Sequence, residues 1–363
     1  MSCSTAYELA ERSHEVFSAI LIKILYPLPR RSPNHALEAI WLCRHRQLKG
    51  ACWRSGVRRM AEVGLVGLAR VALDVARSVL PDYRSKFSKH VFTQPQLLAI
   101  VCLMRYEGWT LRKAEVRLAE HRELREALEL HKAPDYTTLH RFLNRLEERV
   151  LVRALGETVR RAPPPSPHAH HDDQQRRSPA IVAVDATGLS PGAVSTFYVQ
   201  RTQNRGGKPM LWRKWLKWLV LVDTQSQLVL AQEACSGPYN GSAMLRPLAD
   251  VAHALSPFGW LLADAEFDSE RNHRHVREKI GALSVIPAKR GGASWEVGGY
   301  RAEMRAEFPR QLYRRRALVE SVFSAVKRKL STRAPGRSLE TQRTQALLLG
   351  LAYNLYRLKP CSV

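Results

Sequence analysis

The sequence predicts an α/β fold with a mixed sheet flanked by helices in its C-terminal half, preceded by an all-α N-terminal domain. Two observations support this prediction. Apolar residues recur with a helical period over residues 93–161 and with the period of strands after residue 179. The elements predicted in the second half follow the order three strands, helix, strand, helix, strand, helix, which is typical of a mixed α/β sheet.

The chain carries a large excess of positive charge. Its 363 residues are enough to bury a sizeable core and to form two or three domains. Lys and Arg number 57 against 33 Asp and Glu, which gives a formal net charge of +24. This excess indicates a polyanionic partner, of which nucleic acid is the natural one. A membrane surface would attract the same charge, but the sequence has neither a lipidation motif nor a polybasic juxtamembrane block.

Neither a membrane span nor a cysteine site is predicted. The most apolar windows are short or contain charged residues, so they are interpreted as amphipathic helices. The N-terminus lacks the features of a secretory signal, and we therefore expect a cytoplasmic protein. The cysteines have no CxxC spacing and support neither a disulfide framework nor a zinc site. They are Cys3, Cys43, Cys52, Cys102, Cys235 and Cys361.

Residues 1–59 differ in character from the rest of the chain. They mix Cys, Trp and Arg without a sustained period, so we expect a poorly ordered N-terminal extension. A cleaner amphipathic helix begins at Met60, which makes this methionine a candidate for the true start of translation. The predicted boundaries beyond it are a helical domain at 60–161, a linker at 162–179 and an α/β domain at 180–363.

Polar residues and glycine mark the helix ends in the helical domain. Thr93 can cap one helix, Gly108 can end it, and Thr110 can cap the next. Farther along, Asp135 forms part of a predicted turn, and Thr137 can cap the helix that follows.

The last of these helices fit a helix-turn-helix motif. Such a motif would place exposed side chains in a DNA groove. These side chains are Thr138, His140, Arg141, Asn144 and Arg145. An ordinary helical bundle fits the same pattern, so both interpretations stay open.

Residues 162–179 are rich in Pro, His and charge and lack an apolar period, which is typical of a linker. Three histidines beside two aspartates could bind a metal, although a solvated spacer is the favoured interpretation. These residues are His168, His170, His171, Asp172 and Asp173.

Strands and helices alternate after the linker. The run AIVAVDATGL predicts a strand, and WLKWLVLVDTQSQLVLAQEA predicts a hairpin with the turn DTQSQ. A helix at 242–255 and the apolar strand in WLLADAEFD follow. The helix SERNHRHVREKIG, the strand ALSVIPAK, the helix that carries Glu320 and an amphipathic helix at 338–358 complete the fold.

Asp185 and Asp264 each interrupt a run of aliphatic residues where a strand is predicted to end. Open α/β sheets bind their ligands at such ends, and an isolated charge beside a buried strand is costly. Strand-ending aspartates are also common caps and turn formers, so a structural role remains an alternative for either one alone.

Glu320 is the only acid in the basic stretch 311–333. In a regular helix it shares one narrow face with Tyr313, Arg316 and Lys327, while aliphatic residues cover the other side. A solvated stripe with an Arg316–Glu320 pair is the alternative. The two isolated aspartates upstream favour a carboxylate held for a cation.

Three converging carboxylates would repel one another unless divalent cations lay between them. Oxygen ligands suit Mg²⁺ or Mn²⁺ better than zinc. Two such ions can activate an attacking oxygen and stabilise a leaving oxygen at phosphorus. A basic protein with this site is expected to cut or join a phosphodiester backbone.

Several segments resemble the DDE transposases of bacterial insertion sequences. AVDATGL, LLADAEFDSE and YRRRALVESVFSAVKRKL occur in this order and are followed by ALLLGLAYNLYRL. The spacing of Tyr313, Arg316, Glu320 and Lys327 is similar, without a gap, to the Y-R-E-K signature of one large group of these enzymes. The resemblance covers residues 181–363 closely, and the helices at 93–161 look like the DNA-binding domain of the same group.

The resemblance implies a ribonuclease-H-like catalytic domain with Asp185, Asp264 and Glu320 as the metal-binding catalytic triad, holding two Mg²⁺ or Mn²⁺ ions. It further implies that the other members of the signature hold terminal DNA phosphates near the scissile bond. Water attack would free a 3′-hydroxyl at the element's end, and this hydroxyl would attack target DNA. Pairing of two element ends implies a homodimer on double-stranded DNA.

Two departures from the family pattern concern the acids around Asp264. Many relatives have Gly and Tyr after this aspartate, where Ala265, Glu266 and Phe267 stand here. Glu266 and Asp268 are near enough to compete for its role, although Asp268 is better explained as a cap of the next helix. Only 55 residues separate the second and third acids of the triad, too few for a large β-rich insertion, so no hairpin intermediate is inferred.

Aromatic residues and whole-chain alternatives complete the predictions. Trp212, Trp215 and Trp218 alternate with Arg and Lys and could stack on DNA or pack against a helix. Trp295 is interpreted as a core or surface residue. A ribonuclease-H-like nuclease without strand transfer and a catalytically inactive DNA-binding relative remain alternatives to a transposase.

Overall fold

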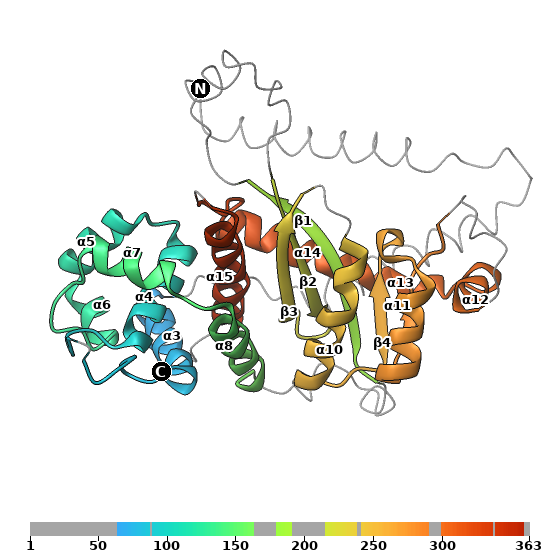
Figure 1. Cartoon of the computed structure of the whole chain (residues 1–363), viewed down its shortest axis with the longest axis horizontal. Coiled ribbons are helices and arrows are strands. Elements are labelled where there is room, and N and C mark those ends of the chain that lie inside the picture. Colours follow the sequence, from blue (N-terminus) through green and yellow to red (C-terminus); the bar gives the residue numbers. More distant parts are fainter. Residues whose placement is uncertain are drawn as a thin grey trace, which may run out of the picture. The chain divides into compact units, whose positions relative to one another are not determined.

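The computed structural model describes residues 64–87, 89–162, 179–190, 215–237, 241–289, 299–336 and 338–358, all within one compact unit (Figure 1). The expectations for residues 1–59, for positions 163–178 of the linker and for Trp212 and Trp295 lie outside the described residues. The separation of the helical and sheet-containing parts into two domains stays a prediction.

The helical part begins and ends its helices where local signals predict. It comprises α3 (Leu65–Val79), α4 (Gln94–Glu107), α5 (Leu111–Glu120), α6 (Arg122–Ala127), α7 (Tyr136–Asn144) and α8 (Glu148–Arg160). The Thr93 side chain accepts a hydrogen bond from the Gln96 backbone and caps α4, which Gly108 ends with a left-handed φ of 65°. Thr110 caps α5 in the same way. These three predicted boundaries are confirmed.

The prediction that Thr137 caps α7 is wrong, because Asp135 occupies the cap. The Asp135 carboxylate accepts hydrogen bonds from the backbone N–H groups of Thr137 at 2.9 Å and Thr138 at 3.0 Å. Hydrogen bonds from Thr137 and Thr138 lower the pKa of Asp135 to about 2. Thr137 therefore lies inside the first turn of the helix, two positions after the residue that caps it.

The C-terminal part contains a five-stranded mixed sheet in the order β3-β2-β1-β4-β5. Its strands are β1 (Ile181–Leu189), β2 (Leu216–Asp223), β3 (Val229–Ser236), β4 (Trp260–Ala263) and β5 (Leu283–Val285). β1, β2 and β3 pair in antiparallel fashion, whereas β4 is parallel to β1 and to β5. The predicted α/β class, the hairpin and the order of the elements are confirmed.

Helices cover both faces of this sheet. α10 (Leu245–Leu255), α14 (Ala317–Lys329) and α15 (Leu339–Leu358) contact its strands. The same part of the chain also contains α11 (Glu270–Arg274) with its π-helical continuation His275–Ile280, α12 (Tyr300–Ala306) and α13 (Arg310–Tyr313). Val184 packs in a core with α10, and alternation along β1 directs Asp185 to the opposite face, which α14 contacts. The sheet thus presents a charged residue to the helix that carries Glu320.

Helix α15 links the helical part to the sheet. It contacts α4, α8 and β3 (Figure 1), and its buried positions run without interruption from Gln345 to Tyr356. A surface helix would bury only one stripe, so this pattern identifies α15 as a helix surrounded by protein.

Candidate active site

Asp185 and Asp264 lie side by side on neighbouring strands. The last parallel pair of β1 and β4 is Val184 with Ala263, and each aspartate is the next residue of its chain. Asp264 follows the end of β4, as predicted. Asp185 does not end its strand, because β1 continues to pair with β2 as far as Leu189. The prediction that both aspartates stand at strand ends is therefore wrong for Asp185.

Backbone groups hold both carboxylates in place. Asp185 Oδ1 accepts a hydrogen bond from the Ala186 N–H at 2.8 Å, and Asp264 Oδ1 accepts one from the Ala265 N–H at 2.6 Å. Asp264 thereby also caps the short 3₁₀ helix Ala265–Phe267. Burial raises the pKa of Asp185, the Ala186 N–H opposes this rise, and the negative charge of Asp264 adds to it.

Arg316 bridges the first and third predicted metal ligands. Its Nη1 donates to Asp185 Oδ2 at 2.6 Å and its Nη2 donates to Glu320 Oε1 at 3.2 Å. The guanidinium centre also lies 5.7 Å from the Tyr313 ring centroid. Burial acts to lower the pKa of Arg316, but the nearby negative charges outweigh it and the net pKa is raised. The arginine is therefore a permanent cation among these carboxylates.

The predicted helical stripe is only partly regular. α13 ends at Tyr313, a 3₁₀ turn spans Arg314–Arg316, and α14 begins at Ala317. The tighter turn changes the angles expected for one continuous α-helix, yet Tyr313 and Arg316 still lie near the two aspartates. Lys327 is exposed and lies two turns beyond Glu320, and no described contact joins it to the carboxylates.

The carboxylates have the right chemistry for a metal but are not gathered around one position. Within the described ranges, no group of three or more His, Cys, Asp or Glu residues is arranged to hold a metal ion. Asp264 Oδ2 accepts no hydrogen bond from any described residue, and the Glu320 side chain is 61% exposed. Such oxygen donors fit Mg²⁺ or Mn²⁺. Glu320 would have to exchange its contact with Arg316 for the ion.

The neighbouring acids are engaged elsewhere. Glu266 pairs with Lys217 and accepts a hydrogen bond from the Gly241 N–H at 3.0 Å. Asp268 has a fully buried side chain and accepts two hydrogen bonds from Arg301, at 2.9 and 2.8 Å. The prediction that Asp268 caps α11 is wrong, because the Ser269 hydroxyl accepts the capping hydrogen bond.

Trp215 and Trp218 pack within the sheet-containing part. Trp218 is fully buried, with its ring centroid 5.8 Å from that of Phe323 in α14. Trp215 is half-buried and lies against Gly188 and Gly237. For Trp218, packing against a helix is the correct alternative and base stacking is excluded by burial.

The candidate DNA-reading residues lie on α7 and at its end. His140, Arg141, Asn144 and Arg145 are exposed, while Leu139, Phe142 and Leu143 are buried. Thr138 is only partly exposed, because its hydroxyl donates to Asp135 at 2.9 Å, so the prediction of an exposed side chain is wrong for this residue. This amphipathic arrangement suits both a recognition helix and an ordinary bundle. Sequence reasoning missed three further arginines near this helix, Arg84, Arg149 and Arg153. A signal was present, because Arg145, Arg149 and Arg153 recur every four residues.

The mixed sheet, with one carboxylate on β1, one directly after β4 and a third on the helix that contacts β1, fits a ribonuclease-H-like domain. Residues 176–355 match the family model described as transposase DDE domain. The sheet-containing part of the chain is therefore similar to the DDE domain of transposases, which are enzymes that cleave DNA. No curated protein matches the chain. Among the described helices, none is long and apolar enough to cross a membrane.

Proposed function

We propose that the protein is a metal-dependent DNA transposase of the Y-R-E-K group, which cleaves the ends of an insertion sequence and transfers the freed 3′-hydroxyl to target DNA. The observation that carries this proposal is the adjacency of Asp185 and Asp264 beneath the Arg316–Glu320 pair of the α14 segment. The transposase DDE domain at residues 176–355 supports the same reaction.

In the proposed site, Asp185, Asp264 and Glu320 would hold two Mg²⁺ or Mn²⁺ ions. Bound there, the ions would supply activation of an attacking oxygen and stabilisation of the leaving one. The Asp185 and Asp264 carboxylates are preoriented by the N–H groups of Ala186 and Ala265. Of the three carboxylates, Glu320 on its exposed helical face is the one that must change position, and Arg316 must release Asp185.

The basic residues of the segment bind the DNA strand. Arg316 exchanges the Asp185 carboxylate for a phosphate, which its guanidinium can grip with two parallel hydrogen bonds, whereas Lys327 acts as a point charge. Tyr313 lies against Arg316 and orients it. The distance of Lys327 from the carboxylates suits a contact with a more distant phosphate of the same strand.

The helical part binds the terminal inverted repeats, with α7 as the recognition helix and Arg141 and Arg145 as DNA contacts. Pairing of two ends calls for a homodimer on DNA. Chromosomal DNA as substrate calls for a reaction in the cytoplasm.

The test uses a duplex with the DNA that flanks the gene and Mg²⁺, with wild-type protein, Asp264→Asn and Glu320→Gln. Glu266→Gln is the matched control, because it removes a carboxylate two positions from Asp264 that already has a lysine partner. We expect cleavage by the wild type and the control and none by the other two. Full cleavage by Glu320→Gln would contradict the mechanism.

Joining of the freed 3′ end to a supercoiled plasmid distinguishes the possible activities. A transposase produces joined products, whereas a nuclease of the same fold stops after cleavage. A chain that binds the duplex but leaves it intact with Mg²⁺ and with Mn²⁺ would be an inactive DNA-binding relative.

A further inference from the structure

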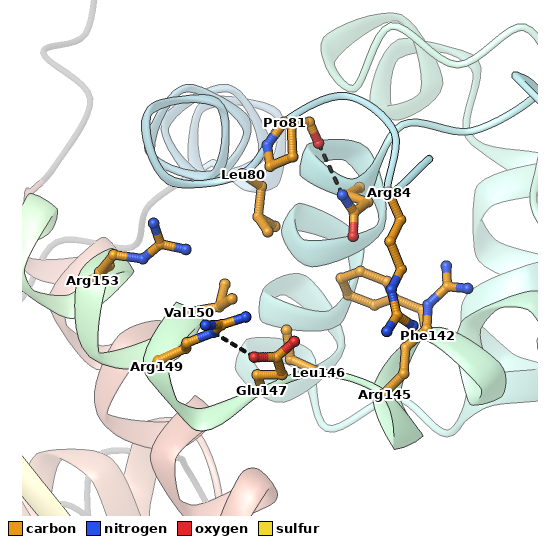
Figure 2. A pocket seen from close by; sticks show the side chains of 11 residues that line it. Leu80, Pro81, Arg84, Phe142, Arg145, Leu146, Glu147, Arg149, Val150 and Arg153 are labelled. Atoms are coloured by element: carbon orange, nitrogen blue, oxygen red, sulfur yellow. Dashed lines mark hydrogen bonds and ion pairs between the residues drawn. The ribbon is translucent and has the colours of Figure 1, made fainter. Parts of the chain in front are cut away.

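A basic pocket lies on the helical part, apart from the carboxylates. Its volume is about 270 Å³, and it opens between the α3–α4 connection and the junction of α7 with α8 (Figure 2). Arginines surround it, namely Arg84, Arg145, Arg149 and Arg153. Nothing in the proposed chemistry of the DDE domain uses these side chains.

The pocket has more positive than negative charge. Four arginines and one acid, Glu147, line it, which leaves an excess of three positive charges. Glu147 pairs with Arg149. No described carboxylate lies within ion-pair distance of the other three arginines, and all three are exposed. Unpaired guanidinium groups around one hollow repel one another, so an anion between them would be stabilising.

The fold brings these arginines together from distant parts of the chain. Arg149 and Arg153 are one turn apart on α8, and Arg145 ends α7. Arg84 belongs to the α3–α4 connection, which is fastened to α4 by a hydrogen bond of 3.1 Å from the Gln94 side chain to the Pro81 carbonyl. The pocket is thus formed by ordered elements and does not depend on a chance arrangement of surface side chains.

The floor of the pocket decides which part of a nucleic acid it can bind. Phe142, Leu146 and Val150 lie there, with exposed fractions of only 2%, 9% and 6%. A base that stacked on Phe142 would need an open ring face, and this ring has none. The guanidinium groups on the rim would therefore bind the nucleic acid, and their planar geometry allows two parallel hydrogen bonds to phosphate oxygens.

We propose that this pocket binds backbone phosphates of duplex DNA next to the groove that α7 contacts. The inference rests on the proposed DNA-binding role of the helical part. Arg141 and Arg145 are one helical turn apart on the exposed side of α7, so a strand that follows this side reaches the pocket where the helix ends. The contact is independent of base sequence and fixes the position of the duplex on α7.

The test compares two double variants of the full chain. The double variant Arg84→Gln with Arg153→Gln removes two positive charges from the pocket and leaves the sequence of α7 unchanged. Arg70→Gln with Lys132→Gln is the matched control, because both residues are exposed, lie in the helical part and have no ion pair with a described residue. Thermal unfolding checks that each variant is folded.

The readout is the salt dependence of binding to a labelled duplex of the gene's flanking DNA, in EDTA to prevent cleavage. Each lost phosphate contact lowers the slope of log K against log salt by about 0.9. We expect a decrease of about 1 to 2 for the pocket variant, the same for specific and unrelated duplexes, and little change for the control. Ethylation-interference mapping of the DNA phosphates should show one cluster of phosphate contacts with the wild type and the control that is missing with the pocket variant.

Two outcomes would overturn the proposal. If the wild type and the pocket variant bind DNA with the same affinity and the same salt dependence, the pocket does not bind phosphate. The DNA-binding function would then stand, and an acidic protein segment would be the favoured ligand of the pocket. If the wild-type protein shows no salt-dependent affinity for DNA, both the phosphate-binding role of the pocket and the proposed function are wrong.

Discussion

Arg316 Nη1 lies 2.6 Å from Asp185 Oδ2, so a residue proposed to hold DNA is hydrogen-bonded to a residue proposed to hold metal. The two side chains are 18% and 19% exposed, which makes this a largely desolvated ion pair. Asp185 can bind a metal ion, and Arg316 can bind a phosphate, only after this ion pair has separated. Metal binding and release of Arg316 for the phosphate are therefore expected to occur together.

Removal of Arg316 should destabilise the metal-free protein. Arg316→Gln leaves the Asp185 carboxylate in its half-buried position without a cation, at a cost of about 1–3 kcal/mol. Asp185→Asn in the same chain should recover part of this loss, since it removes the unpaired charge. Urea unfolding of the four proteins in EDTA measures the coupling. Strictly additive effects would show that the ion pair contributes nothing to folding.

The buried Asn354 should be essential for attaching α15 to the sheet. Its side chain accepts from the Val229 N–H at 3.0 Å and donates to the Val229 carbonyl at 2.8 Å and to Thr158 Oγ1 at 3.0 Å. Asn354→Ala leaves both backbone groups of Val229 unpaired, and we expect a loss of at least about 3 kcal/mol in the free energy of unfolding.

Thr158→Val is the matched control for Asn354. It removes one of the three hydrogen bonds of Asn354, together with the bond from the Thr158 hydroxyl to the Leu155 carbonyl at 2.6 Å, and preserves the shape of the side chain. A loss of about 1–2 kcal/mol is therefore expected. Chemical denaturation measures both variants. Equal losses would contradict the importance assigned to the Val229 contacts.

Gly350 permits the close approach of α15 to β3. A Cβ atom at this position would overlap with Gln232 Oε1. Gln232 cannot withdraw freely, because it accepts from Trp218 Nε1 at 3.1 Å and donates to the Leu347 carbonyl at 2.8 Å. Gly350→Ala should therefore destabilise the protein by about 1–3 kcal/mol, although alanine is the better helix former by about 1 kcal/mol.

Gly156 offers the opposite case on α8. A Cβ there would lie 3.4 Å from Leu255 Cδ1, an ordinary contact. Gly156→Ala should increase stability by up to about 1 kcal/mol, through helix propensity alone. The melting temperatures of the two alanine variants should thus change in opposite directions, and a shared direction would refute the packing argument.

Cys102 should be unreactive in the folded protein. It is 3% exposed, and burial raises the pKa of its thiol to about 12. The thiolate that reacts with alkylating agents is therefore almost absent at pH 8. Peptide mapping after iodoacetamide treatment should find Cys102 unmodified until denaturant is added and the half-buried Cys235 modified earlier. Modification of both at one rate would contradict the buried position.

Features set by neighbouring residues were predictable from the sequence. The helix boundaries at Thr93, Gly108 and Thr110 could be predicted, because each of these residues marks its boundary through contacts with backbone groups only a few positions away. Asp135 and Thr137 are both good caps two positions apart, and sequence alone favoured the wrong one. The change of period correctly predicted where helices give way to strands, between α8 and β1.

Features that depend on distant partners were not predictable in the same way. β1 continues past Asp185 because it pairs with β2 as far as Leu189, whose partner is Leu216. This partner strand lies too far along the chain to be matched to β1 from the sequence. Asp268 is buried because Arg301, 33 positions later, neutralises it. The Arg316–Glu320 pair, which the spacing suggested as the alternative to a metal ligand, does form, but the bond from Arg316 to Asp185 joins residues 131 positions apart.

The position of α15 has a consequence for synthesis of the protein. Residues 339–358 leave the ribosome after every other described element, yet α4, α8 and β3 all rest on them. A polypeptide released before residue 339 would have two unfinished cores and would be open to proteolysis. A chain that stops early should therefore be degraded and should not accumulate as a stable fragment.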